Sequence, residues 1–222
     1  MKVIILAGGN QTRFGEISRE KSKILLPLPQ SETILSNIVR QLNQTEIEKI
    51  IIALKDKNFI ADYTKNLSSK KEIVIDDRDI SGLGNYFFKS TSYLPATYIF
   101  GDTYFPNNSL TAYFSELKGK TDLRVKAVIG VSRSHVGDFR VEVSGDYATK
   151  ISRDGTHGYF TCGLFTFIDS GIVGKLEPCD KLTDVFSQLL EKNYKVGYVL
   201  MEEGLIDLDT QDKAKELMNL IS

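Results

Sequence analysis

The stretch KVIILAGGNQTRFGEISREKSKILLP, residues 2–27, indicates how the fold begins. Its first six residues are a short apolar run rich in β-branched side chains, which predicts a strand that ends at two glycines. Because glycine has no Cβ, the backbone N–H groups of Gly8 and Gly9 can approach a phosphate oxygen closely. The glycine spacing matches neither the P-loop pattern G-x-x-x-x-G-K-[ST] nor the dinucleotide pattern G-x-G-x-x-G. From the glycines alone, a phosphate-binding loop and a plain tight turn both remain open.

Strand-like and helix-like patterns alternate through the first half of the chain. Apolar β-branched runs predict strands, and apolar residues at helical spacing predict helices. The strands are expected at 2–7, 49–54, 72–76 and 96–102, and the helices at 33–43, 56–67, 85–94 and 109–118. This alternation favours a parallel, doubly wound sheet, with ligands at the carboxyl ends of its strands.

The second half begins with strands in succession, which predicts a more antiparallel arrangement. The expected strands are 125–132, 138–145, 148–152, 159–167 and 195–201, with helices at 182–193 and 210–221. No repeat or linker rich in Pro, Gly or Ser interrupts the sequence. We therefore expect one domain, residues 1–222.

Charge and cysteine usage exclude several classes of protein. The 28 Lys and Arg residues balance 29 Asp and Glu residues, so no strong overall field exists to hold a nucleic acid. Cys162 and Cys179 lack metal-binding spacing and are expected to be reduced thiols. No apolar run approaches the roughly 18 residues of a membrane span, and the start of the chain does not resemble a secretory signal. These features predict a cytoplasmic protein without a membrane partner.

Two basic residues follow the glycines, and their chemistry suits phosphate. The planar guanidinium of Arg13 can hold two phosphate oxygens, while the ammonium of Lys23 is a compact charge that can follow one oxygen. The whole stretch resembles the signature of nucleotidyltransferases that activate sugar 1-phosphates, L-A-G-G-x-G-T-R-x-x-x-x-T-x-x-x-P-K-x-L-L-P. The matching residues are Leu6, Ala7, Gly8, Gly9, Thr12, Arg13, Lys23, Leu25, Leu26 and Pro27. Gln11 stands where the family mostly has Gly, and Ser22 replaces the Pro before the Lys.

The resemblance implies a fold and separate roles for the two halves of the chain. The expected fold class is α/β, with a Rossmann-like, doubly wound mixed sheet of the GT-A-like type and a more antiparallel acceptor-binding lobe. Residues 1–105 would mainly bind the nucleoside triphosphate (NTP), and residues 106–222 mainly the acceptor. Arg13 and Lys23 would be the catalytic pair. Arg13 would hold the triphosphate, and Lys23 would bridge the α-phosphate and the attacking phosphate. The nucleotide-binding residues would be Leu6, Ala7, Gly8, Gly9, Gln11, Thr12 and Gly82.

Chemistry on a nucleoside triphosphate normally needs Mg²⁺, which prefers oxygen ligands. Asp102 lies at the carboxyl end of the strand expected at 96–102 and resembles the family's metal-binding Asp after its central strand. Asp207, in LIDLDTQD, resembles the second metal ligand. A rival acidic run, Asp76, Asp77 and Asp79 around Arg78, is interpreted as a solvated loop because charge runs are usually exposed.

The sequence has fewer recognisable motifs for the acceptor-binding residues. Gly163 resembles the glycine of the family's N-A-G-I-Y-x-F strand, which lets substrate approach the backbone. The family's E-K-P is missing, and Lys150 is a candidate cation in the short segment that remains. This segment is also similar to cytidylyltransferases that activate phosphocholine, where Asp184 could lie near an acceptor amine. For Asp184 we favour the simpler interpretation, an acidic residue at a helix N-terminus.

The sequence therefore predicts an Mg²⁺-dependent nucleotidyltransferase that transfers a nucleoside monophosphate from an NTP to a small phosphorylated acceptor and releases pyrophosphate. A sugar 1-phosphate is the favoured acceptor. The alternatives are a CTP-dependent cytidylyltransferase for phosphocholine or a similar phospho-alcohol, a molybdenum-cofactor guanylyltransferase and a non-catalytic nucleotide-binding regulator. The base, the acceptor and the oligomeric state stay open.

Overall fold

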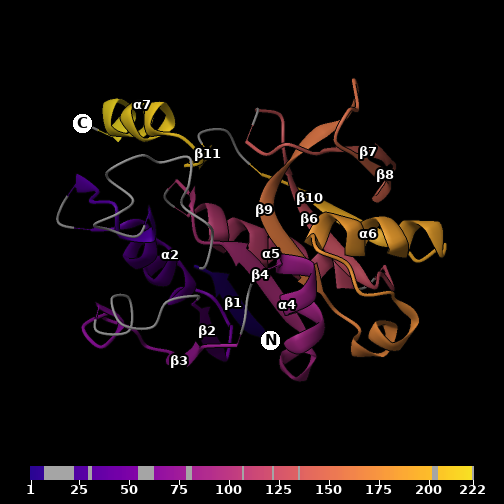
Figure 1. Cartoon of the computed structure of the whole chain (residues 1–222), viewed down its shortest axis with the longest axis horizontal. Helices are drawn as coiled ribbons and strands as arrows, with labels where there is room; N and C mark the ends of the chain where they lie inside the picture. Colours follow the sequence, from indigo (N-terminus) through magenta and orange to yellow (C-terminus); the bar gives the residue numbers. More distant parts are fainter. Residues whose placement is uncertain are drawn as a thin grey trace.

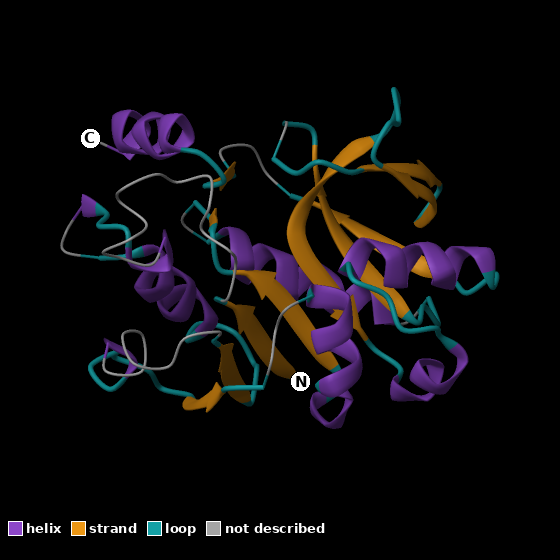
Figure 2. Ribbon diagram, in the orientation of Figure 1, coloured by secondary structure: helices purple, strands orange, loops and turns teal. Residues whose placement is uncertain are grey.

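A mixed sheet of nine strands forms the centre of the described structure (Figure 1 and Figure 2). This computed structural model describes residues 1–7, 23–29, 32–54, 63–78, 82–106, 108–121, 123–134, 136–201 and 205–221. The strands lie in the spatial order β3-β2-β1-β4-β9-β6-β10-β8-β7. Their bounds are β1 Lys2–Leu6, β2 Lys49–Ala53, β3 Glu72–Asp76, β4 Ala96–Phe100, β6 Ala127–Ser132, β7 Arg140–Ser144, β8 Tyr147–Ser152, β9 Tyr159–Phe167 and β10 Val196–Leu200.

Strand directions differ between the two halves of the sheet. β3, β2, β1 and β4 are parallel to one another, whereas β9 is antiparallel to both β4 and β6. β7 and β8 form an antiparallel hairpin, as expected for successive strands. β10 departs from that pattern because it returns after a helix and pairs in parallel with β6. The mixed α/β fold predicted from the sequence is confirmed.

The helices agree closely with the sequence pattern. Their bounds are α2 Ile34–Leu42, α4 Leu83–Lys89, α5 Ser109–Thr121, α6 Leu182–Glu191 and α7 Gln211–Ile221, with 3-10 turns η1 Lys23–Leu25, η3 Thr91–Tyr93 and η4 Ser170–Lys175. The helix expected at 85–94 is divided between α4 and η3, and most of the helix expected at 56–67 lies outside the described residues. In the part of the chain that is described, no helix is long and apolar enough to cross a membrane.

Helices cover both faces of the sheet because successive strand residues point to opposite sides. In β1, Val3 and Ile5 pack with α2 and α5 in one core cluster, while Ile4 and Leu6 pack with α4 and α6 in another. All four side chains are buried. Figure 1 shows α4 beside α6, two helices that are also in contact with each other. This packing fixes the position of the α4 and α6 N-termini relative to the strand ends.

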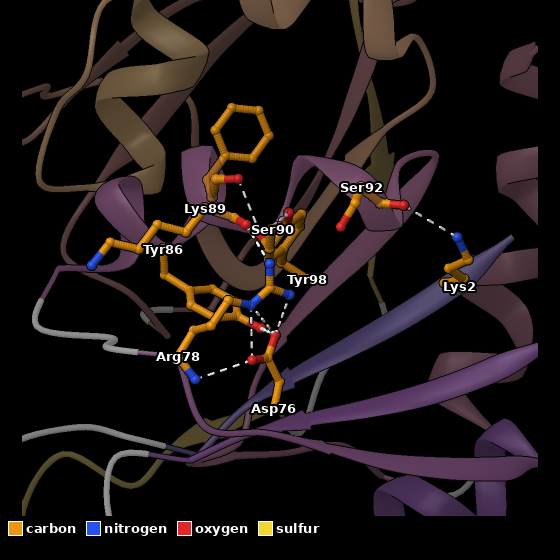
Figure 3. Close-up of polar contacts among 9 residues, drawn as sticks. Lys2, Asp76, Arg78, Tyr86, Lys89, Ser90, Ser92 and Tyr98 are labelled. Atoms are coloured by element: carbon orange, nitrogen blue, oxygen red, sulfur yellow. Dashed lines mark hydrogen bonds and ion pairs between the residues drawn. The ribbon is translucent and has the colours of Figure 1, made fainter.

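The acidic run after β3 is only partly solvated, so its interpretation as a solvated loop was wrong for Asp76. This carboxylate is buried and accepts hydrogen bonds from the Tyr86 hydroxyl at 2.6 Å and from Arg78 Nε at 2.9 Å (Figure 3). Arg78 also donates to the carbonyl oxygen of Lys89. Asp77 is exposed, as expected, and Asp79 lies outside the described residues. The Asp76–Arg78–Tyr86 cluster ties β3 to α4.

Candidate active site

The carboxyl ends of β1 and β4 meet at one edge of the sheet. The Gly101 amide donates to the carbonyl oxygen of Leu6 at 3.0 Å, so the chain turns directly above the end of β1. A Cβ at Gly101 would lie 2.9 Å from that oxygen and 2.8 Å from the Ile24 side chain, which leaves no space for a larger residue. The next residue, Asp102, is therefore held at the sheet edge where parallel α/β sheets bind ligands.

The short turn η1 brings Lys23 to the same edge. Ile24 and Leu25 are buried in the core cluster that contains α2, and they anchor the turn. Burial raises the pKa of both Asp102 and Asp207, and the charge of Lys23 partly offsets this rise at each carboxyl. The Lys23 Nζ is 3.5 Å from the carbonyl oxygen of Asp209. The sequence motif thus places the Lys23 ammonium near a group of carboxylates.

Asp207 reaches Asp102 through a second, very small sheet. β5, Thr103–Tyr104, pairs antiparallel with β11, Ile206–Asp207, and Asp207 lies opposite Thr103. The Leu208 amide then donates to the carbonyl oxygen of Asp102 at 2.8 Å. Two carboxylates about a hundred residues apart in the sequence are in this way brought to one place.

Burial and mutual repulsion disfavour the ionised forms of Asp102 and Asp207. Burial is the main cause that raises the pKa of Asp207, and the negative charges of Asp102 and Asp209 raise it further, against Lys213 and Lys23. Burial also raises the pKa of Asp102, against the charge of Lys23. Two like charges in a site of low polarity favour an additional cation, because it offsets both desolvation and repulsion.

The donor set fits Mg²⁺ held together with substrate. Among the described residues, no group of three or more His, Cys, Asp or Glu side chains is arranged to hold a metal ion. Mg²⁺ usually keeps several waters and is bound by one or two carboxylates together with substrate phosphates. Asp102 and Asp207 could supply two such carboxylates, and bound phosphates could supply further oxygen ligands.

A pocket of about 220 Å³ adjoins Asp207. Its lining includes Phe100 and Thr103 from the β4–β5 segment and Gly163 from β9. Gly163 has φ of +74°, and a Cβ there would lie 3.0 Å from both the Phe100 Cβ and the Thr103 Oγ1. The left-handed backbone and this tight contact both require glycine. The structure therefore brings Gly163 and Asp207, predicted for different roles, to one cavity.

Gly82 borders this region from another side. It precedes α4 as its N-cap, and its neighbour Leu83 lines the pocket. The carbonyl oxygen of Asp180, another pocket residue, accepts from the Gly84 amide at 2.9 Å, while its carboxylate accepts from the Asn85 amide group at 2.8 Å. The N-terminus of α4 is thus held against the segment that leads into α6.

Two acceptor candidates lie outside the pocket lining. Lys150 is exposed on β8, where its Nζ lies 3.3 Å from a Glu142 carboxylate oxygen. Asp184 occupies the first turn of α6, in agreement with the simpler interpretation of this residue. Neither side chain is among the residues that line the cavity.

The structure describes the first two residues of the predicted nucleotide-binding stretch. Leu6 ends β1, and the Ala7 amide donates to the carbonyl oxygen of Ala53 at 2.9 Å, so both lie at the carboxyl edge. The other predicted loop residues, Gly8, Gly9, Gln11, Thr12 and Arg13, lie outside the described residues.

Several pocket residues had no signal in the sequence. Val136, Phe139, Lys181 and Thr183 line the cavity together with the predicted residues. Helix α6 begins at Leu182, as predicted, and its N-cap is Lys181. A loop aromatic or a threonine beside a helix start is too common to be singled out from one sequence.

Comparisons with known proteins agree with the observed fold. Residues 2–80 match the family model described as nucleotidyl transferase. No curated protein matches the chain in sequence. Similar solved structures include the inositol-1-phosphate CTP transferase from T. maritima, with a TM-score of 0.78 and 18% identity over 99% of this chain and 95% of that one.

Two further structures are similar to the same degree. One is a putative glucose-1-phosphate thymidylyltransferase from Bacillus anthracis, with a TM-score of 0.78 and 20% identity over 100% of this chain and 95% of that one. The other is the CTP:phosphocholine cytidylyltransferase from Streptococcus pneumoniae, with a TM-score of 0.78 and 18% identity over 100% of this chain and 99% of that one. These structures show that the chain shares their fold, and the match of residues 2–80 agrees with the predicted resemblance to nucleotidyltransferases.

Proposed function

We propose that this chain is a nucleotidyltransferase that transfers a nucleoside monophosphate from an NTP to a small phosphorylated acceptor. An acceptor phosphate oxygen forms a bond to the α-phosphorus, and the bond from that phosphorus to the bridging oxygen of the β-phosphate breaks. Pyrophosphate then leaves with the bonding electrons. The observation that carries the proposal is the meeting of Lys23, Asp102 and Asp207 beside a pocket at the carboxyl edge of the sheet.

Lys23 has a defined task in this reaction. Its ammonium group is already held near the carboxylates by the buried residues of η1. A preorganised cation of this kind stabilises negative charge that builds up on phosphate oxygens, and it costs little reorganisation during the reaction. Arg13 would hold the triphosphate and the departing pyrophosphate, as its place in the sequence motif implies.

Asp102 and Asp207 would hold Mg²⁺, which supplies charge neutralisation at the α-phosphate when bound. The pocket beside Asp207 would hold the organic group of the acceptor, with its phosphate directed toward the carboxylates. No general base is needed, because the attacking phosphate is already ionised near neutral pH. Catalysis in this account comes from positioning and charge rather than from a covalent intermediate.

The reaction is tested by pyrophosphate release across a matrix of the four NTPs and phosphate acceptors, with and without Mg²⁺. The acceptors should include glucose 1-phosphate, mannose 1-phosphate, inositol 1-phosphate and phosphocholine. We expect turnover with one pair, and loss of turnover in Asp102→Asn. Asp212→Asn is the matched control, because Asp212 is an exposed carboxylate on α7. Binding of NTP without turnover in any combination would favour a nucleotide-binding regulator instead.

A further inference from the structure

Lys181 is the one basic side chain among the described residues that line the pocket beside Asp207. The residue directly precedes α6, whose first residue, Leu182, is buried in the core cluster on the α4 side of the sheet. Leu182 therefore holds the wall that carries Lys181, while Lys181 itself is exposed and accessible to a ligand. Lys150, the cation predicted from the sequence, lies on β8 outside this lining.

The Lys181 ammonium is held by an aromatic ring and not by a carboxylate. It lies 5.5 Å from the centre of the Phe139 ring, and within the described part of the chain no carboxylate forms an ion pair with it. A contact with a ring face is electrostatic, so it does not use up the three N–H donors of an ammonium group as hydrogen bonds would. Because Phe139 also lines the pocket, the contact keeps the ammonium at the cavity.

The other polar side chains of the lining do not suit an anion. The Asp138 carboxylate is paired with Arg153 at 2.8 Å, and the Asp180 carboxylate accepts a hydrogen bond at 2.8 Å from a side-chain amide of α4. Asp207 is a carboxylate as well and repels a negative ligand. The remaining polar groups are threonine hydroxyls and a buried thiol, which carry no charge to offset an anion. Lys181 is therefore the group of this lining that attracts a negatively charged ligand.

A lysine at this position does not stabilise α6. The N-terminus of a helix carries a partial positive charge, which disfavours a neighbouring cation. The N-cap position favours Ser, Thr, Asp or Asn, and Lys181 makes no side-chain hydrogen bond there. The stability of the helix thus gives no reason for the lysine, and residues that break a local rule are expected at functional sites.

Lys181 and Asp207 line the same cavity from two different walls. The start of α6 carries Lys181, and Figure 1 shows α6 and β11 on opposite sides of β9. An acceptor in this cavity of about 220 Å³ therefore has Asp207 on one wall and Lys181 on another. A phosphate monoester carries about 1.5 to 2 negative charges near pH 7. The four-carbon stem of lysine is flexible, so the ammonium can leave the ring for a phosphate oxygen.

We infer that Lys181 binds a phosphate group of the acceptor through its ammonium and offsets part of the negative charge there. Two phosphate groups of an acceptor fit this chemistry: the one that attacks the NTP, and a second one carried by the organic group. The inference rests on the proposed function, because it takes the cavity beside Asp207 as the acceptor pocket. Lys181 is thus a residue that determines acceptor affinity.

The test is acceptor binding by calorimetry without Mg²⁺, so that no turnover occurs. The probes are glucose 1-phosphate, inositol 1-phosphate, phosphocholine and glucose 1,6-bisphosphate, and inorganic phosphate is added as a competitor without an organic group. Lys181→Met removes the charge and keeps the length of the side chain, whereas Lys181→Arg keeps the charge. Lys192→Met is the matched control, because Lys192 is an exposed residue at the other end of α6.

We expect Lys181→Met to bind phosphorylated probes and inorganic phosphate about 10- to 100-fold more weakly than wild type, the usual effect of a lost hydrogen bond to a charged group. Lys181→Arg should restore most of the affinity, and Lys192→Met should bind as wild type does. NTP affinity should be the same in Lys181→Met as in wild type. The melting temperature of Lys181→Met should stay equal or rise, because a cation at a helix N-terminus is not stabilising.

The probes separate the two sources of phosphate. A loss of affinity for the monophosphates that wild type binds identifies the phosphate that attacks the NTP. A loss confined to glucose 1,6-bisphosphate identifies a second phosphate on the organic group.

Equal binding of every phosphorylated probe by wild type and Lys181→Met would overturn the inference, as would a wild-type chain that binds none of them. A loss for a sugar phosphate without any loss for inorganic phosphate would show that Lys181 contacts a hydroxyl, which also contradicts it. An equal loss of NTP affinity, or a clear fall in the melting temperature of Lys181→Met, would do the same. The expected binding contrast without any pyrophosphate release would instead count against the proposed function alone.

Discussion

The Leu208 amide donates to the carbonyl oxygen of Asp102 across 2.8 Å, next to the β5–β11 ladder that holds Asp207 opposite Thr103. Two backbone contacts between distant segments therefore place the two carboxylates of the candidate active site. Because backbone atoms make these contacts, substitution of either carboxylate should leave their arrangement intact. Effects of such substitutions can then be attributed to charge.

Asp207→Asn should separate stability from activity. The substitution removes one of two neighbouring negative charges that burial disfavours, so the melting temperature without divalent ions should stay equal or rise. Pyrophosphate release should fall by about 100-fold or more, because charge stabilisation at the phosphate is weakened. Melting curves with EDTA and with Mg²⁺ provide the check, since added Mg²⁺ should stabilise wild type more than the variant. A lower melting temperature in EDTA together with full activity would contradict this account of Asp207.

Gly163→Ala should destabilise the chain by about 1–3 kcal/mol. The residue has a φ of +74°, and the new Cβ would lie 3.0 Å from atoms of Phe100 and Thr103. Gly119→Ala is the matched control, because Gly119 lies in α5 and a Cβ there meets nothing within 4 Å. That control should gain up to about 1 kcal/mol from helix propensity. Chemical denaturation of both variants tests the pair, and equal stabilities would show that Gly163 tolerates a side chain.

The buried Asp76 gives a pH-dependent prediction. Burial opposes its ionisation, but hydrogen bonds from Arg78 and Tyr86 outweigh that effect and hold the pKa of the carboxyl below its usual value. A lowered folded-state pKa stabilises the chain at pH values above the unfolded-state pKa of about 4. This stabilisation is lost as the pH falls through the lower, folded-state value.

Asp76→Asn should accordingly cost about 1–3 kcal/mol near pH 7, because it removes the charge that pairs with the half-buried Arg78. The difference from wild type should shrink as the pH falls below about 4, where the unfolded chain becomes protonated at this position, and on through the lower folded-state pKa. Urea denaturation at a series of pH values measures it. A difference that is independent of pH would mean that the ionised carboxylate is not what stabilises the cluster.

The sequence predicted elements whose signal is local. The β-branched runs at β1, β2 and β3 and the apolar spacing of α2 were sufficient to place each of them. The two-residue strands β5 and β11 were missed, because two residues show no periodicity and their pairing depends on the tertiary fold. The signature also predicted that Asp102 and Asp207 belong together, while the fold supplies their proximity.

Tertiary contacts explain the interpretation that failed. The acidic run at the end of β3 resembles a solvated loop, yet Asp76 is buried because Tyr86 and Arg78 converge on it from α4 and from the loop itself. The contact with Tyr86 joins two separate elements, so no local pattern in the sequence predicts it. The start of α6 at Leu182, by contrast, was predicted, because its apolar spacing is local.

The central claim is that Lys23 and the carboxylates act on the same phosphate. Single-turnover pyrophosphate release should be measured for Lys23→Met, Asp207→Asn and the double variant, with Lys215→Met as the control on exposed α7. We predict that each single variant loses about 100-fold or more in rate and that the double variant loses far less than the product, because residues that act as a unit are not additive. Wild-type rates in Lys23→Met, or fully multiplicative losses in the double variant, would contradict the account.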